Sequence, residues 1–170
     1  MQTSEIAVDG RCDFDFLLGK RTGLNRKRVN LLARDSEWIE FEGYNNAYPI
    51  VGGLGNAETF EAPEFPGRPG FEGFTLRLFE PETGLWRIWW ASSAGNGQLD
   101  NPVVGRFVDG VGIFECDDVV DGVELRVRYT WQRIARDSSV WEQSFSFDDG
   151  SSWDVNWIAE FTQADDAAPA

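Results

Sequence analysis

Histidine is absent from this sequence, and cysteine occurs only twice, as Cys12 and Cys116. Without histidine the chain cannot form a Ser-His-Asp triad, a Cys-His pair, or a haem or zinc site that uses imidazole. Two cysteines are too few for a disulfide framework, and these two are too far apart for a CxxC redox or zinc motif. They favour a reduced, cytoplasmic setting, although the sequence leaves a single disulfide between them open.

Basic residues and long apolar runs are also scarce. The chain has 15 Lys and Arg against 29 Asp and Glu, a formal net charge of -14, so it repels polyanions and we expect no nucleic-acid partner. No apolar stretch approaches the roughly 20 residues of a membrane-spanning helix. The first ten residues lack the basic start and the apolar run of a signal peptide. These features predict a cytoplasmic protein with no membrane partner.

Apolar residues are plentiful, at 42% of the 170 residues, and aromatic residues make up 14%. A chain of this length and composition can bury a sizeable core and corresponds to one domain. We predict an N-terminal arm at 1–13, a single β-barrel domain at 14–163 and a disordered tail at 164–170.

Asp-Gly dipeptides divide the second half of the chain into short segments. They occur at 9–10, 109–110, 121–122 and 149–150, and this dipeptide readily adopts the positive φ angles of a tight hairpin. Segments joined by such short turns pair antiparallel. About nine or ten strands are predicted, at 28–34, 37–44, 56–61, 73–80, 85–92, 103–108, 111–116, 123–134, 140–147 and 153–161.

A sequential meander of this kind favours an all-β, antiparallel up-and-down closed β-barrel over a sandwich, because closure removes exposed strand edges. Only residues 13–19 predict a short helical turn, with Asp13 or Asp15 as its cap. Residues 61–73 contain three prolines and three glycines and predict a long loop that could act as a lid.

Strand alternation predicts an aromatic interior, because successive side chains point to opposite faces. Residues 85–92 are apolar on both faces, so the sequence does not decide which of the two faces points inward. In the other strands the inward rows are Val123, Leu125, Val127, Tyr129 and Trp131, then Trp141, Gln143, Phe145 and Phe147, and then Trp153, Val155, Trp157, Ala159 and Phe161. These rings either fill the core or form the wall of a ligand cavity.

Motifs for metal or phosphate chemistry are weak. The Asp pairs at 117–118, 148–149 and 165–166 lie at turns or in the tail, where Asp is favoured by local hydrogen bonds, and Gly52-Gly53-Leu54-Gly55 lacks the Lys-Ser/Thr of a phosphate loop. We expect no metal and no cofactor. The basic run Lys20, Arg21, Arg26, Lys27 and Arg28 is interpreted as a solvated face, with recognition of an acidic ligand headgroup as the alternative.

Several segments resemble a group of bacterial lipocalin-like (calycin) barrel proteins, over about 14–162. They are Asp15-Phe16-Leu17-Leu18-Gly19, the runs at 73–77 and 104–112, and, most specifically, Trp141 to Trp157. The resemblance implies a closed antiparallel barrel that binds a small, mainly apolar molecule at its open end. Lipocalin-like proteins commonly have Gly-x-Trp in the first strand, whereas this chain has Gly19-Lys20-Arg21. Either another aromatic residue closes that end or the site is reshaped.

Three functions are compatible with these observations. The first is binding of a small hydrophobic or polycyclic metabolite, with Trp89, Trp131, Trp141, Trp157 and Phe145 as the walls and with Tyr129 and Gln143 as orienting groups. The second is a cofactor-independent cyclase or isomerase of secondary metabolism, in which Tyr129, Gln143 or Arg77 polarises a carbonyl in the same cavity. The third is an interaction module in which residues 85–92 form a homodimer interface.

Overall fold

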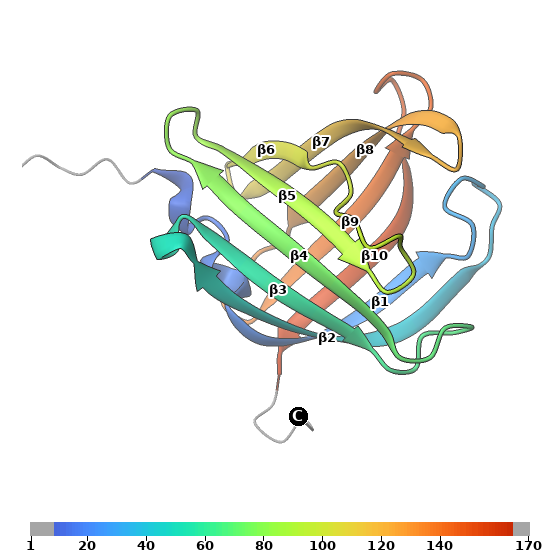
Figure 1. Ribbon diagram of the computed structural model, residues 1–170, viewed down its shortest axis with the longest axis horizontal. Coiled ribbons are helices and arrows are strands. Elements are labelled where there is room, and N and C mark those ends of the chain that lie inside the picture. The colour runs from blue at the N-terminus through green and yellow to red at the C-terminus, as the bar shows by residue number, and fades with distance from the viewer. Residues whose placement is uncertain (1–8, 165–170) are drawn as a thin grey trace, which may run out of the picture.

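The chain forms a closed, ten-stranded antiparallel barrel, as predicted (Figure 1). The computed structural model describes residues 9–164. Each strand pairs with its neighbours in the sequence, and β1 pairs with β10 to close the sheet. The strands are β1 (Gly19–Arg28), β2 (Trp38–Ile50), β3 (Gly55–Ala62), β4 (Phe71–Glu80), β5 (Leu85–Ser92), β6 (Val103–Val108), β7 (Val111–Val120), β8 (Val123–Gln132), β9 (Ser138–Ser146) and β10 (Asp154–Gln163).

The first strand lies earlier in the sequence than predicted. The strand expected at 28–34 is wrong, because β1 ends at Arg28 and residues 29–37 form the β1–β2 loop. Asn30 makes the local hydrogen bonds of a turn there: its carbonyl accepts the Ala33 N–H at 3.2 Å and its side chain accepts the Leu32 N–H at 3.0 Å. The apolar residues Leu31 and Leu32 favoured the strand prediction, but they lie in the loop and pack against the core from there.

Three Asp-Gly dipeptides form the predicted hairpin turns. Asp109, Asp121 and Asp149 have φ angles of 50°, 47° and 56°, and the glycine after each also has a positive φ. The fourth dipeptide, Asp9-Gly10, instead precedes a 3₁₀ turn, η1 (Gly10–Cys12), and the Asp9 side chain caps it by accepting the Arg11 N–H. Neither Asp13 nor Asp15 occupies the predicted cap position, since the next turn, η2 (Asp15–Leu17), begins after Phe14. A third turn, η3 (Val51–Gly53), follows β2.

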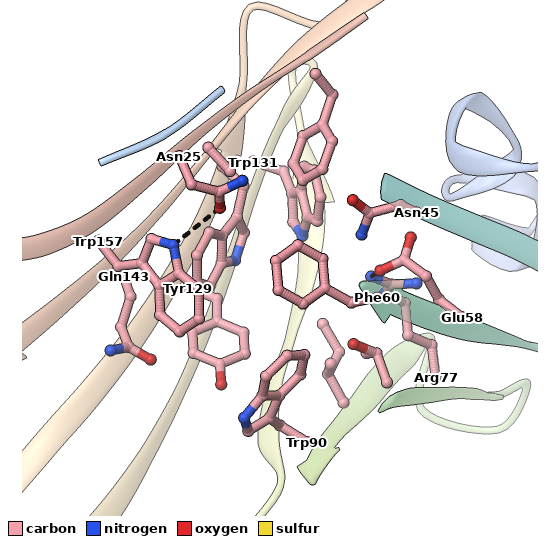
Figure 2. Close-up of a pocket in the computed structure, with 15 residues that line it drawn as sticks. Asn25, Asn45, Glu58, Phe60, Arg77, Trp90, Tyr129, Trp131, Gln143 and Trp157 are labelled. Carbon is pink, nitrogen blue, oxygen red and sulfur yellow. Dashed lines mark hydrogen bonds and ion pairs between the residues drawn. The ribbon is translucent and has the colours of Figure 1, made fainter. Parts of the chain in front are cut away.

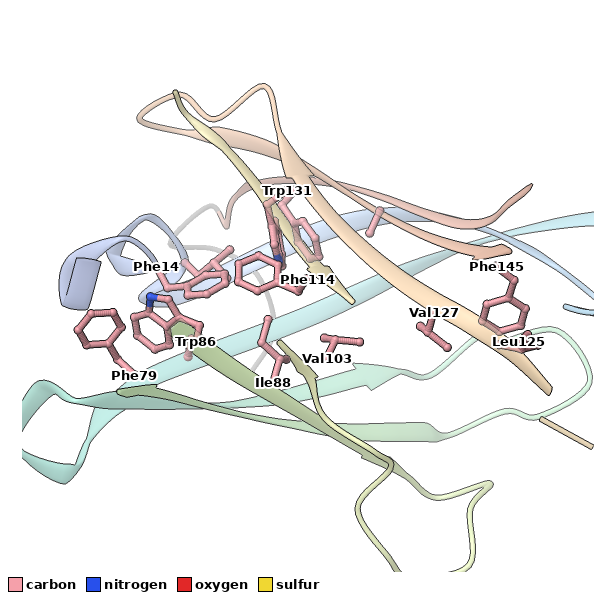
Figure 3. Packing of buried hydrophobic residues seen from close by; sticks show 14 residues of the cluster. Phe14, Phe79, Trp86, Ile88, Val103, Phe114, Leu125, Val127, Trp131 and Phe145 are labelled. Carbon is pink, nitrogen blue, oxygen red and sulfur yellow. The ribbon is translucent and has the colours of Figure 1, made fainter. Parts of the chain in front are cut away.

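An aromatic cluster closes one end of the barrel (Figure 3). Phe14, between η1 and η2, is 1% exposed and packs edge-on against Trp86 at 4.9 Å and Phe107 at 5.0 Å. The Trp86 indole N–H donates to the Gly10 carbonyl at 3.0 Å, which fixes the N-terminal segment across this end. We call it the floor. Phe14 and Trp86 therefore close the end at which the first strand lacks a tryptophan.

A β-bulge in β10 changes which of its residues face inward. Val155 lies opposite Ser144 and Trp157 lies opposite Gln143, so Asn156 is the extra residue. The bulge leaves Trp157, Ala159 and Phe161 on the inner face, as predicted, and reverses the alternation before Asn156. The predicted inward positions of Val155 and Trp153 are wrong. Val155 shares the outer face with Ser144, and Trp153 stacks on Arg128, with the guanidinium 3.8 Å from the ring centre.

The strand ends account for the remaining differences. Phe147 is predicted on the inner face, but it follows the last residue of β9 and is 39% exposed.

Cys12 and Cys116 are both free thiols. Most of the predicted arm (residues 1–8) and nearly all of the predicted tail (residues 165–170) lie outside the described residues. Within 9–164, no helix is long and apolar enough to cross a membrane.

Candidate functional site

A cavity of about 70 Å³ lies inside the barrel above the floor, and its walls have two chemically different sides (Figure 2). One side carries Asn45, Glu58 and Arg77 from β2, β3 and β4. The opposite side is aromatic and includes Tyr129, Trp141 and Trp157 from β8, β9 and β10. We call this space the inner cavity. Its size suits a compact group of a few heavy atoms rather than a ring system.

Two inward-facing glycines leave room for the rings at the top of the inner cavity. A methyl group on Gly73 would overlap the indole of Trp90, and one on Gly43 would overlap the ring of Phe60. The rings of Phe60 and Trp90 therefore lie next to each other inside the barrel, with their centres 6.1 Å apart. Both rings line the inner cavity, so the glycines help to set its upper limit.

The aromatic wall is held in place by ring contacts and one buried hydrogen bond. The Trp157 indole N–H donates to Asn25 Oδ1 at 3.0 Å (Figure 2). Trp157 meets Trp141 at 5.5 Å and Trp90 at 6.1 Å, and both pairs are edge-to-face. Tyr129 meets Trp141 in the same geometry at 5.2 Å. Edge-to-face pairs of this kind stabilise one arrangement of the rings, so the wall is preorganised.

The polar wall contains a buried ion pair. Arg77 is 3% exposed and Glu58 is 5% exposed, and Arg77 Nη2 lies 3.1 Å from Glu58 Oε1. Arg77 Nη1 also donates to Asn56 Oδ1 at 2.8 Å. The guanidinium lies 5.2 Å from the ring centre of Phe14, so it forms a cation–π contact with the floor. The carboxylate neutralises the buried guanidinium, which makes its place beside apolar rings tolerable.

Two buried polar atoms on this wall have no partner within the described residues. They are Asn45 Oδ1, an acceptor, and Arg77 Nε, a donor. Both side chains line the inner cavity. A buried polar group without a hydrogen bond is costly, and a hydroxyl group has the chemistry to partner either atom because it donates and accepts.

Two further polar groups lie on the aromatic side. Removal of the Tyr129 hydroxyl from water, reinforced by the charge of Asp100, raises the pKa of Tyr129 above its usual value, so the hydroxyl stays protonated at neutral pH. The Gln143 amide donates to Asn156 Oδ1 at 2.9 Å. The bulge that displaces Asn156 therefore also fixes the orientation of Gln143.

The structure brings together six of the eight residues predicted for the site. Those lining the inner cavity are Arg77, Tyr129, Trp131, Trp141, Gln143 and Trp157. The predicted position of Trp89 is wrong, because Trp89 lies opposite Leu76 on the outer face and Trp90 takes the inward position. Phe145 is buried but packs near Leu125 and Val127, away from Phe14 (Figure 3). The functional roles of all eight stay predictions.

Sequence reasoning missed Trp90, Asn45 and Glu58. Trp90 was ambiguous because β5 is apolar on both faces, and only its pairing with Thr75 fixes the inward face. Asn45 was missed because it lies beyond the strand predicted at 37–44, whereas β2 continues to Ile50, and Glu58 was missed because no inward row was assigned to the strand predicted at 56–61. Alternation from Phe41 through Gly43 to Asn45, which share the inner face of β2, was a signal that could have found Asn45.

A second, larger cavity of about 380 Å³ lies at the end of the barrel opposite the floor. It is bordered by the loops β1–β2, β3–β4 and β5–β6, and Trp90 and Trp157 line it as well as the inner cavity. We call it the mouth cavity. Phe65, from the predicted lid loop, is 7% exposed and packs on Phe41 at 4.4 Å. The loop at 63–70 therefore covers part of the barrel end.

Within residues 9–164, no group of three or more Cys, Asp or Glu side chains is placed to hold a metal ion. Comparison with known proteins finds no family model that matches the chain. No curated protein matches it significantly either.

Proposed function

We propose that this chain binds a small, mainly apolar molecule that carries one hydrogen-bonding group. The body of the molecule occupies the mouth cavity, and its polar end reaches the inner cavity between Asn45 and Arg77. The observation that carries the proposal is the pair of unpartnered polar atoms, Asn45 Oδ1 and Arg77 Nε, on the polar wall of a cavity whose opposite wall is aromatic. An apolar pocket with a few convergent polar groups is typical of small-molecule sites.

Cavity size narrows the choice of ligand. The mouth cavity, at about 380 Å³, falls within the usual range of ligand pockets, whereas the inner cavity, at about 70 Å³, does not. A polycyclic body therefore fits only in the mouth cavity. Trp90 and Trp157 line both spaces, and the proposal requires these rings to rotate so that one ligand can occupy both. We further propose that the protein is lipocalin-like, which the closed antiparallel barrel supports.

A matched pair of probes tests this proposal. 2-Naphthol has the fused-ring body and one hydroxyl, and naphthalene lacks only the hydroxyl. Isothermal titration calorimetry should show that 2-naphthol binds about tenfold more tightly, the gain expected when buried polar atoms acquire hydrogen bonds. Asn45→Leu should remove most of this difference. The adjacent Asn46→Leu, at an exposed position, is the matched control and should keep it.

Failure of both probes to bind would contradict the proposed function. Equal binding of the two probes would support an apolar binding cavity but reject the assigned role of Asn45 and Arg77.

A homodimer through β5 stays a prediction. Trp89 lies on the outer face of β5, near the partly exposed Phe74 of β4, and light scattering over a range of concentrations would test it.

A further inference from the structure

The mouth cavity is lined by two cations and no carboxylate. Among the described residues, its charged lining consists of Lys27 from β1 and Arg68 from the β3–β4 loop. The whole chain carries 29 acidic residues against 15 basic ones. A cavity lined only by positive charge is therefore contrary to the charge of the molecule as a whole.

Lys27 points into the barrel rather than outward into solvent. It lies opposite Trp157 on β10 and Ile39 on β2, and it shares its face with the buried Asn25, two residues earlier. Its Nζ lies 5.2 Å from the ring centre of Trp157 and 5.9 Å from that of Phe65. The structure thus corrects the expectation that the whole basic run is a solvated face.

Neither cation forms an ion pair within the described residues. Seven salt bridges occur there, and all of them involve other arginines. Burial, and then the charge of Arg68, lowers the pKa of Lys27 below its usual value. The ammonium group is therefore in unfavourable surroundings, and a bound anion would relieve both effects.

We propose that the mouth cavity recognises a carboxylate on the ligand, with Lys27 and Arg68 as the binding cations. This inference rests on the proposed function and names the ligand class: an apolar body with a hydrogen-bonding group at its inner end and a carboxylate at its outer end. Trp90, Trp157 and Phe65 contact the body. Charge-assisted hydrogen bonds to Lys27 and Arg68 hold the carboxylate at the barrel end.

The test adds a carboxylate to the probe already used. 6-Hydroxynaphthalene-2-carboxylate keeps the hydroxyl of 2-naphthol and carries the carboxylate at the far end of the rings. By isothermal titration calorimetry at low salt, the wild-type chain should bind it about tenfold more tightly than 2-naphthol. The preference should shrink in 0.5 M salt, because ions screen an accessible pair.

Substitutions assign the preference to the two cations. Lys27→Met keeps the apolar stem on Trp157 and should abolish the preference, so that the variant binds the carboxylate probe and 2-naphthol about equally. Arg68→Gln, on an exposed loop position, should reduce it severalfold even if Lys27→Met folds poorly. Lys20→Met, at an exposed position near the start of the same strand, is the matched control and should leave the preference unchanged.

The outcomes separate this inference from the proposed function. If 2-naphthol binds but the carboxylate adds nothing, the proposed function stands and the anion site is rejected. The same rejection follows if the preference survives Lys27→Met and Arg68→Gln together. If neither probe binds the wild-type chain, both the proposed function and this inference are overturned.

Discussion

At the scale of single residues, the Glu58–Arg77 pair determines the character of the inner cavity. Arg77 touches the floor ring Phe14 on one side and borders the inner cavity on the other. Its charge is balanced by Glu58 at 3.1 Å and one of its nitrogens is bonded by Asn56. The pair therefore places a donor beside the inner cavity without leaving a net charge there.

Removal of the carboxylate charge tests this role. Glu58→Gln leaves the buried Arg77 uncompensated and should lower the free energy of unfolding by about 3 kcal/mol, as measured by urea denaturation. The double variant E58Q/R77M should be more stable than E58Q, because it removes the uncompensated charge. A cost below about 1 kcal/mol for E58Q would contradict a tightly coupled buried pair.

Inward polar residues were the hardest feature to predict from the sequence. Alternation correctly placed Tyr129, Trp131, Trp141 and Gln143, because β8 and β9 alternate regularly along the inner row. It could not identify Lys27 as inward-facing, since a lysine in a basic run looks the same as a solvated one. Only the position of Lys27 opposite Trp157 across the β1–β10 pair reveals its direction.

At the scale of elements, the β9–β10 turn is held together by one carboxylate. Asp148 accepts hydrogen bonds from the Ser146 hydroxyl at 2.8 Å, the Ser152 N–H at 2.8 Å and the Ser152 hydroxyl at 2.6 Å. These bonds, the Ser152 hydroxyl first, lower the pKa of Asp148 to about 2. The turn precedes the bulge that orients Gln143, so its order bears on the cavity.

The lowered pKa gives the stability contribution of Asp148 a definite pH range. A carboxyl with a lower pKa in the folded state stabilises that state above its unfolded pKa, near 4, and loses this effect as the pH falls toward 2. Asp148→Asn should therefore lower the Tm at pH 6, and the difference from wild type should shrink steeply as the pH falls from 4 to 2. Thermal unfolding by circular dichroism measures both.

A matched control for this turn is Asp121→Asn in the β7–β8 turn. Asp121, like Asp148, is an exposed aspartate in the turn between two paired strands, but no side-chain hydrogen bond of Asp121 occurs within 9–164. Its substitution should leave the Tm unchanged at both pH values. A Tm difference for Asp148→Asn that is as large at pH 2 as at pH 6 would contradict the assignment to ionisation.

The sequence predicted the elements whose position depends on local residue preferences. It did not predict features that depend on pairing between strands. The Asp-Gly turns located the hairpins because their positive φ angles are a local requirement. The β10 bulge has no comparable signal, because every second residue from Trp153 to Phe161 is apolar. The shift at Asn156 appears only in the pairing with β9.

At the scale of the whole molecule, the barrel has a closed end and an end that contains the mouth cavity. Phe14, Trp86 and Phe107 fill the floor, while the mouth cavity opens among three loops. The sequence predicted a closed barrel because ten short strands in sequential order leave few other ways to cover strand edges. It did not predict which end would be closed, since the first strand lacks the tryptophan expected there.

The most direct measurement of the central claim is a crystal structure of the chain with 2-naphthol. We predict electron density for the rings against Trp90 and Trp157, with the hydroxyl oxygen within hydrogen-bond distance of Asn45 Oδ1 or Arg77 Nε. A ligand bound only on the outer surface, with the inner cavity filled by rearranged side chains, would contradict the claim that this barrel binds small molecules through its interior.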